Sequence, residues 1–184
     1  MVLTKTPICN FGEKTKSFEL KGIDGQLHKL EDHIGKNGLL IMFICNHCPY
    51  VKAIIRDIVE DCKNLKKEGV NSIAIMSNDT KEYPEDSFEN MKIFSKKFNF
   101  SFPYLIDETQ EIAKEYGAVC TPDFFGYNSN LELQYRGRIR ELKDLKPVNS
   151  GESDLLKAMR LIIKTKKGPK NQIPSMGCNI KWAK

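Results

Sequence analysis

Hydrophobic and polar residues follow two periods along this chain, and together they predict alternating strands and helices. Residues 17–38 alternate between apolar and polar positions around Asp24-Gly25, which predicts a β-hairpin with its turn at that pair. Residues 39–44 (LLIMFI) and 70–79 (VNSIAIMSND) contain continuous apolar runs, as in strands that are buried on both faces. The first half of the chain therefore predicts a hairpin followed by buried central strands.

Helical spacing of apolar residues marks the segments between and after these strands. The first such helix begins at Pro49 and stops at Gly69, because proline is favoured in the first turn of a helix and glycine just after its last turn. Further helices are predicted at 84–100, 108–118 and 153–167, a strand at 102–107, and a hairpin at 122–139 with its turn at 128–130. This order predicts an α/β fold, a central mixed sheet flanked by helices, with one domain over residues 1–165 and a C-terminal tail over 166–184.

Composition narrows the class of protein. The 184 residues are 40% hydrophobic and 29% charged with a net charge of +5, as in an ordinary soluble globular protein. Lysines are dispersed except at 164–170, so we expect no nucleic-acid partner. Residues 1–16 lack the apolar core of a secretory signal and no run reaches membrane-spanning length, which predicts no membrane association and a cytoplasmic location. In a reducing compartment, the six cysteines cannot be assumed to form structural disulfides.

Cys45 and Cys48 form a C-x-x-C pair between the strand at 39–44 and the helix that begins at Pro49. The start of a helix offers unpaired N–H groups and a partial positive charge, which stabilise a thiolate. This spacing brings the two sulfurs within bridging distance, so the pair can cycle between dithiol and disulfide. His47, between them, either donates to a thiolate or faces solvent as a loop residue; the sequence leaves both readings open. We therefore predict Cys45 and Cys48 as catalytic residues.

A zinc site is the alternative use of the same cysteines. His28 and His33 complete a Cys2His2 set with Cys45 and Cys48 by residue type alone. The histidines precede the cysteines, however, and lie within a predicted hairpin. We therefore expect no metal and no cofactor, and a zinc-stabilised or redox-sensing interaction module stays a second alternative.

Three stretches of the sequence resemble a known family: MFICNHCPYVKAI (42–54), YGAVCTPDFFGYN (116–128) and FELKGIDGQLHKLED (18–32). They are similar to the thioredoxin superfamily, and within it to the peroxiredoxin-like branch grouped with alkyl hydroperoxide reductase and thiol-specific antioxidant proteins. The resemblance covers about residues 10–165, and the tail sequence GCNIKW is also similar to that subgroup.

The resemblance implies a thioredoxin fold with an N-terminal β-hairpin extension. It implies that Cys45 is the exposed attacking cysteine and that Cys48 resolves the mixed disulfide. It also implies that Thr121-Pro122 is a cis-proline element that lies against the dithiol and pairs with the substrate backbone.

Departures from the family pattern favour disulfide chemistry over peroxide chemistry. Typical peroxiredoxins carry P-x-x-x-[ST]-x-x-C, but here those two positions hold Ile41 and Cys45 in one register, and Gly38 and Met42 in the other. Arg136 or Arg138 could supply the guanidinium that peroxiredoxins use, or could be plain surface charges. The predicted function is therefore thiol–disulfide oxidoreductase, with an antioxidant thiol peroxidase as the alternative. Expected partners are protein or small-molecule disulfides, or hydroperoxides, and a reductant that the sequence does not identify.

Two further cysteines are candidate redox residues. Cys120 directly precedes Thr121-Pro122 and is either a third redox sulfur near the dithiol or a small buried hydrophobe. Cys178 is either a relay thiol on a mobile tail or part of a tail that folds back with Trp182 as its hydrophobic anchor. The sequence settles neither choice, nor the oligomeric state.

Overall fold

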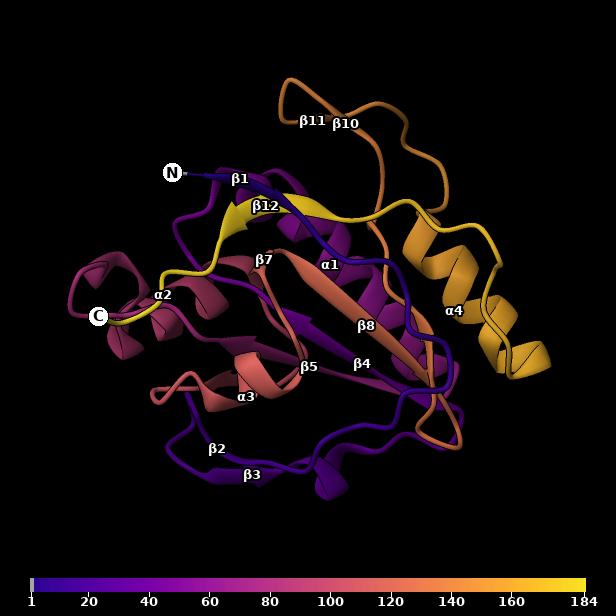
Figure 1. The fold of residues 1–184 in the computed structure, drawn as a ribbon, viewed down its shortest axis with the longest axis horizontal. Coiled ribbons are helices and arrows are strands. Elements are labelled where there is room, and N and C mark those ends of the chain that lie inside the picture. The colour runs from indigo at the N-terminus through magenta and orange to yellow at the C-terminus, as the bar shows by residue number, and fades with distance from the viewer. Residues whose placement is uncertain (1) are drawn as a thin grey trace.

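The computed structural model describes residues 2–184, which fold around a central mixed β-sheet (Figure 1). The strands run in the order β3-β2-β6-β5 and β4-β8-β9, and the N–H of Ile44 joins the two halves by donating to the carbonyl of Ile75 at 3.0 Å. β5 and β6 are parallel, whereas the other pairs in these two halves are antiparallel. The strands are β2 (Glu19–Gly22), β3 (Leu27–Lys29), β4 (Gly38–Phe43), β5 (Val70–Met76), β6 (Tyr104–Ile106), β8 (Asp123–Asn128) and β9 (Leu133–Tyr135).

Helices cover both faces of this sheet, as the sequence predicts. β4 is fully buried, and its alternate side chains point to two separate cores. Leu40 and Met42 share one core with α1 (Pro49–Lys67), α2 (Phe88–Phe98) and α4 (Asp154–Thr165). Leu39, Ile41 and Phe43 pack in the other core, which includes Ala113 of α3 (Glu111–Glu115). Short 3-10 turns lie at η1 (Leu30–His33) and η2 (Pro84–Asp86). The predicted mixed sheet between helices is confirmed.

The second helix begins later than the sequence pattern predicts. Residues 84–86 form the separate turn η2, and α2 starts at Phe88, because the Ser87 side chain accepts a hydrogen bond from the N–H of Asn90 and caps the helix. The first helix begins at Pro49 as predicted, with Cys48 as its N-cap residue. This places Cys48 at the helix end where backbone N–H groups are unpaired.

A small second sheet, absent from the sequence prediction, joins both ends of the chain. Its order is β1-β12-β7, with β1 (Leu3–Lys5), β12 (Met176–Asn179) and β7 (Cys120–Thr121) all antiparallel (Figure 1). Cys178 and Ile180 are buried, whereas Trp182 is 41% exposed. The tail therefore folds back on the domain, and Trp182 is not the buried anchor that one reading of the sequence suggested. The domain boundary at residue 165 stays a prediction.

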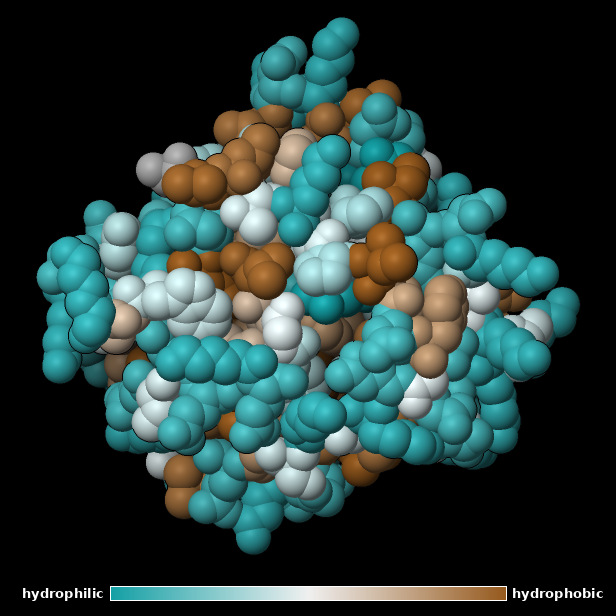
Figure 2. Space-filling view, viewed as in Figure 1, coloured by the Kyte–Doolittle hydropathy of each residue, from teal (hydrophilic) through white to brown (hydrophobic). Residues whose placement is uncertain are grey.

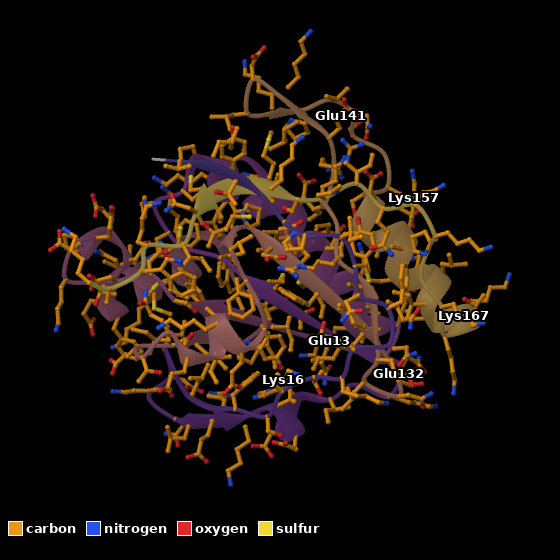
Figure 3. All side chains as sticks on the ribbon, in the orientation of Figure 1. Glu13, Lys16, Glu132, Glu141, Lys157 and Lys167 are labelled. Carbon is orange, nitrogen blue, oxygen red and sulfur yellow. The ribbon has the colours of Figure 1, made fainter. Side chains whose placement is uncertain are left out.

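The surface carries many charged side chains and some exposed hydrophobic ones. Charged side chains surround the molecule, among them Lys157 on α4, Lys167 just after it, and Glu141 just before the hairpin of β10 (Leu142–Lys143) and β11 (Lys146–Pro147) (Figure 3). Hydrophobic side chains gather along one edge over β1 and this hairpin, where Leu3 and Leu145 are exposed (Figure 2). These exposed hydrophobic residues thus lie on and next to the small sheet. No helix in residues 2–184 is long and apolar enough to cross a bilayer.

Candidate active site

The two predicted catalytic cysteines lie where β4 gives way to α1. Cys45 is 1% exposed and Cys48 is fully buried. The hydroxyl oxygen of Thr121 lies 3.2 Å from Cys45 Sγ, and the Thr121 carbonyl oxygen lies 3.2 Å from Cys48 Sγ. The resemblance implied an exposed Cys45, and this is wrong for the structure: the β7 segment covers the dithiol.

Thr121 and Pro122 reach the dithiol from a distant part of the chain. The peptide bond between them is cis, as the resemblance implied. β7 ends at Thr121 and β8 begins at Asp123, so the proline separates two strands that belong to different sheets. Both the side chain and the carbonyl of Thr121 therefore face the sulfurs. The part of these two residues in binding a substrate stays a prediction.

Hydrogen bonds shift the pKa values of Cys45 and Cys48 in opposite directions. Hydrogen bonding with the side chain of Cys45, together with the side chain of Cys178 and the backbone of Val51 and Cys178, lowers the pKa of Cys48 despite its burial. Burial, together with the bond to Cys48, raises the pKa of Cys45. Of the two cysteines, Cys48, at the N-terminus of α1, is therefore the one whose surroundings favour the thiolate. The order expected from the sequence, in which Cys45 attacks first, stays a prediction.

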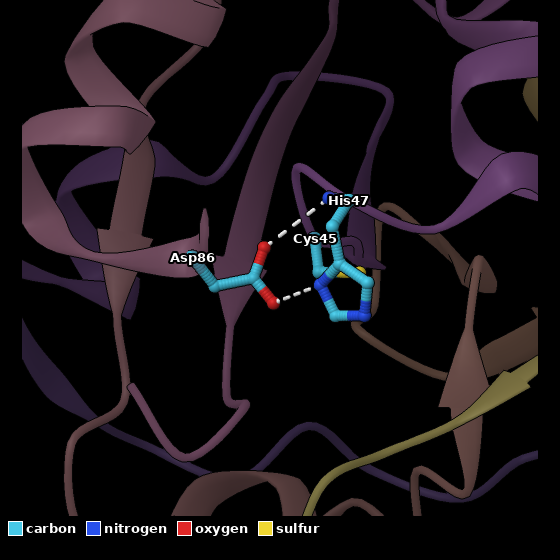
Figure 4. A group of neighbouring side chains, drawn as sticks. All are labelled: Cys45, His47 and Asp86. Atoms are coloured by element: carbon cyan, nitrogen blue, oxygen red, sulfur yellow. Dashed lines mark hydrogen bonds and ion pairs between the residues drawn. The ribbon is translucent and has the colours of Figure 1, made fainter. Parts of the chain in front are cut away.

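His47 lies beside Cys45, and its ring binds a buried carboxylate, that of Asp86 (Figure 4). Its Nδ1 lies 2.6 Å from Oδ2 of Asp86, and its backbone N–H donates to Oδ1 at 3.3 Å. This bond raises the pKa of His47. The ring also stacks on Tyr83, with 5.6 Å between ring centroids. His47 is therefore not the solvent-facing loop residue of one sequence reading, and its role toward a thiolate stays a prediction.

Asp86 is the residue that the sequence analysis missed. It is fully buried, and besides His47 it accepts hydrogen bonds from the N–H of Asn46 at 2.8 Å and from the side chain of Asn78 at 2.8 Å. Burial raises its pKa, but these donors outweigh burial and the pKa is lowered overall. Asp86 thus fixes the loop between the two cysteines. Its only signal in the sequence is the acidic PED turn, which is typical of any helix start.

Hydrogen bonds that are already present limit metal binding beside the dithiol. Within residues 2–184, Cys45, His47 and Asp86 are the one group of three candidate ligands whose atoms approach within 4.8 Å of one another. Both oxygens of Asp86 already accept hydrogen bonds, and tetrahedral zinc needs a fourth ligand. The group therefore does not fit a structural zinc site.

The alternative Cys2His2 set, which the sequence analysis disfavoured, is not formed among residues 2–184. His28 and His33 stack on each other at 5.0 Å between ring centroids, and their Nδ1 and Nε2 atoms lie 2.9 Å apart. Nε2 of His28 also lies 3.0 Å from Asp24. The hairpin keeps these histidines together and outside the group of candidate ligands at the dithiol, because strand pairing fixes them on β3 and the following turn.

The remaining candidate residues are placed as follows. Cys178 Sγ lies 2.8 Å from Cys48 Sγ, so the tail cysteine belongs to the site. Cys120 is fully buried with its sulfur 3.8 Å from the carbonyl oxygen of Pro122, and burial raises its pKa. Arg136 donates to Asp123 rather than to a cysteine. The redox role of Cys120 stays a prediction.

Comparison with known proteins assigns the chain to a family. The AhpC/TSA family model matches residues 11–142, well over half of the chain. The chain belongs to the AhpC/TSA family. Among curated relatives of this AhpC/TSA protein, the thiol-disulfide oxidoreductase ResA of Bacillus thuringiensis subsp. konkukian (strain 97-27) is 27% identical over 122 residues, 66% of each chain. The match thus spans just under two thirds of that relative's length.

Solved structures extend the comparison to the whole fold. An uncharacterized conserved protein from Geobacillus kaustophilus is 38% identical, with a TM-score of 0.94 over 100% of this chain and 97% of that one. A thiol:disulfide interchange protein of the thioredoxin family from Chlorobium tepidum TLS is 16% identical, with a TM-score of 0.63 over 83% of this chain and 97% of that one. At this identity, the second match establishes the thioredoxin fold alone.

Proposed function

We propose that this AhpC/TSA protein is a thiol–disulfide oxidoreductase that works through the Cys45–Cys48 dithiol. The observation that carries the proposal is a hydrogen-bonded pair of sulfurs at a helix N-terminus, one of which has a lowered pKa. A thiolate is the species that attacks a disulfide, and a second thiol on the same loop completes the exchange. The ResA relatives, whose name states this activity, support the same reading.

The reaction needs only the two cysteines and a disulfide. One thiolate attacks a substrate disulfide R–S–S–R′, forms a mixed disulfide and releases R′–S⁻. The second cysteine attacks the mixed disulfide, closes the Cys45–Cys48 bond and releases R–S⁻. The substrate gains two electrons and the dithiol loses two. An external dithiol then restores the reduced protein.

A hollow beside the site favours a protein substrate. A cavity of about 240 Å³ lies next to Pro122 and is lined by Tyr50, Ile54, Ile139 and Met176, among others. These apolar walls fit a hydrophobic side chain that flanks a disulfide in an unfolded polypeptide. We therefore expect the enzyme to reduce insulin faster than glutathione disulfide at equal concentration.

Insulin reduction with dithiothreitol as electron donor tests the proposal. We expect turbidity to rise with wild-type protein, and Cys45→Ser and Cys48→Ser to abolish the increase. Cys9→Ser is the matched control, because Cys9 lies in the leading segment outside the site. A wild-type rate equal to that of dithiothreitol alone would refute the function.

The order of attack is tested by trapping. If Cys45 attacks first, Cys48→Ser accumulates a mixed disulfide on Cys45; if Cys48 attacks first, Cys45→Ser accumulates one on Cys48. Intact mass followed by peptide mapping identifies which cysteine carries the substrate.

A thiol peroxidase is the second candidate, and membership of the AhpC/TSA family is the observation that favours it. The guanidinium of Arg136 is bound by Asp123 and lies over the Phe125 ring, 4.4 Å from its centroid. Arg138 binds Asp154. Both guanidinium groups are thus paired with carboxylates. A peroxide rate no higher than that of a free thiol would exclude this antioxidant activity.

The cytoplasmic location also belongs to the proposal. Cell fractionation with an antibody to the protein tests it.

A further inference from the structure

The C-terminal strand β12 carries a third sulfur to the dithiol. Sγ of Cys178 lies 2.8 Å from Sγ of Cys48, which is about 0.8 Å more than the length of a disulfide bond. The two residues are 130 positions apart in the chain, so only the tertiary fold brings them together. Cys178 is 2% exposed and packs in the same core as both catalytic cysteines.

β12 is held at this place by the strands on either side. Cys178 is opposite Thr121 of β7 on one side and opposite Leu3 of β1 on the other. The neighbouring Gly177 approaches so closely that a Cβ on it would lie 2.0 Å from the carbonyl oxygen of Thr121. Only glycine fits this contact without moving the strand. The pairing of β12 with its neighbours and the close contact at Gly177 therefore fix the position of Cys178 over the dithiol.

No other cysteine has this relation to the dithiol. The sulfur of Cys62 contacts the sulfur of Met42 at 4.0 Å inside the core, and the thiol of Cys120 donates to the carbonyl of Pro122 at 3.8 Å. Cys9 lies in the leading segment and packs on the opposite core. Outside the C-x-x-C pair, geometry thus selects Cys178 as a partner for Cys48.

We propose that Cys178 is a third redox thiol, and that the oxidised protein carries a Cys48–Cys178 disulfide that fastens the C-terminal strand over the site. This inference rests on the proposed function, which supplies the Cys45–Cys48 disulfide. The thiolate of Cys178 attacks Sγ of Cys48, the Cys48–Cys178 bond forms, the Cys45–Cys48 bond breaks, and Cys45 leaves as a thiolate. One disulfide replaces another, so the step needs no further oxidant.

Electrostatics around Cys178 change in the direction that this step requires. In the reduced protein, burial and the neighbouring Cys48 raise the pKa of Cys178, whereas Lys181 lowers it. Once Cys48 is in a disulfide it carries no charge, so its contribution disappears while that of Lys181 remains. Cys178 therefore loses its proton more readily after the dithiol is oxidised than before.

A disulfide map of the oxidised protein tests the inference. Reduced wild-type protein is oxidised with glutathione disulfide, alkylated at low pH, digested and analysed by mass spectrometry. We expect the linked Cys48–Cys178 peptides in wild type and in the Cys9→Ser control, and only a Cys45–Cys48 linkage in Cys178→Ser. A wild-type map with Cys45–Cys48 as its only linkage overturns the inference.

Gly177→Ala provides an independent test that leaves every cysteine in place. Its Cβ would push β12 off β7, so we expect loss of the Cys48–Cys178 linkage while Cys45–Cys48 forms. Persistence of the Cys48–Cys178 linkage at the wild-type level would overturn the claim that the close contact of Gly177 positions Cys178, while the linkage itself would stand. Circular dichroism confirms that the variant is folded before mapping.

The inference and the proposed function fail in different ways. Wild-type protein that does not reduce insulin refutes the function, whatever its disulfide map. Wild-type protein that reduces insulin but forms only Cys45–Cys48 refutes the role of Cys178 alone. Oxidised wild type should also unfold at a higher urea concentration than oxidised Cys178→Ser, since its disulfide closes a much longer loop; equal midpoints would count against the linkage.

Discussion

Replacing Asp86 with asparagine perturbs the loop that holds the two cysteines while keeping its shape. One oxygen of asparagine can still accept from the backbone N–H groups of Asn46 and His47, which bind Oδ1 of Asp86. The new amide nitrogen, however, replaces Oδ2 and faces two donors, Nδ1 of His47 and the side chain of Asn78. The substitution therefore removes a charge-assisted bond and leaves buried donors unsatisfied.

The loss of stability in Asp86→Asn follows from the burial of Asp86. Asp86 is fully buried, and the side chain of His47 is 15% exposed. Breaking a buried ion pair costs about 3–5 kcal/mol, and the partial exposure of His47 places Asp86→Asn at the lower end, about 3 kcal/mol. Glu85→Gln is the matched control, because Glu85 is the exposed neighbour in the same turn and we expect it to change the free energy of unfolding by less than about 0.5 kcal/mol.

The effect also has a defined pH dependence. The pKa of His47 is raised above 6.5, so stabilisation from its charged form is complete below pH 6.5 and is lost as the pH rises through the folded pKa. The pKa of Asp86 is lowered below 3.8, so its contribution is present above pH 3.8 and is lost as the pH falls through the folded pKa. The difference between wild type and Asp86→Asn should therefore be largest between these two values.

Urea unfolding at several pH values, with NMR titration of His47, measures this prediction. We expect the His47 pKa to fall in Asp86→Asn and the insulin-reduction rate to decrease with it. A stability difference that is constant from pH 5 to pH 9, or an unchanged His47 pKa, would refute the charge coupling. Equal losses in Asp86→Asn and Glu85→Gln would refute the part that burial plays.

Three further substitutions test other parts of the structure by urea unfolding. Burial raises the pKa of Asp61 from 3.8 to about 6, and Asp61→Asn can still accept the hydrogen bond from Ser153. The free energy of unfolding of Asp61→Asn should therefore exceed that of wild type by up to about 3 kcal/mol at pH 8, and the difference should disappear as the pH falls toward 4. No increase at pH 8 would contradict this prediction. Arg136→Met leaves the buried Asp123 without its partner and should cost about 3–5 kcal/mol, whereas a cost below about 1 kcal/mol would show that the pair is not needed. Gly38 has φ of 148°, and a Cβ there would lie 2.4 Å from a carbonyl oxygen of β8, so Gly38→Ala should cost about 1–3 kcal/mol and a neutral result would refute the close approach.

Local pattern was enough to predict the elements that surround the site. The apolar run at 39–44 is a strand buried on both faces because every one of its side chains meets a core, and Pro49 starts a helix because the first turn needs no N–H from it. The C-x-x-C pair therefore lies at a strand–helix junction, as predicted. The helix at 84–100 was predicted four residues too early, because the pattern did not reveal that Ser87 is the capping residue.

Long-range contacts decided what the pattern left open. Nothing near Cys178 in the sequence indicates that β12 inserts between β1 and β7, since each of these strands is only two to four residues long and is stabilised by pairing with distant segments. The same holds for Asp86, whose carboxylate binds a loop some forty residues away. Side-chain identity made Cys178 a candidate redox residue without indicating its place beside Cys48, and it gave no sign of Asp86.

The sequence by itself determined the fold class, the dithiol and its place at the start of α1, because hydrophobic period and helix-start signals are local properties of the chain. Tertiary structure alone decided how the dithiol is bonded: that Cys45 is buried, that Cys48 carries the lowered pKa, that His47 binds Asp86, and that Cys178 lies 2.8 Å from Cys48. The reason is physical. Burial and hydrogen-bond donors set the acidity of a thiol, and both come from segments that only the folded chain brings to the same place.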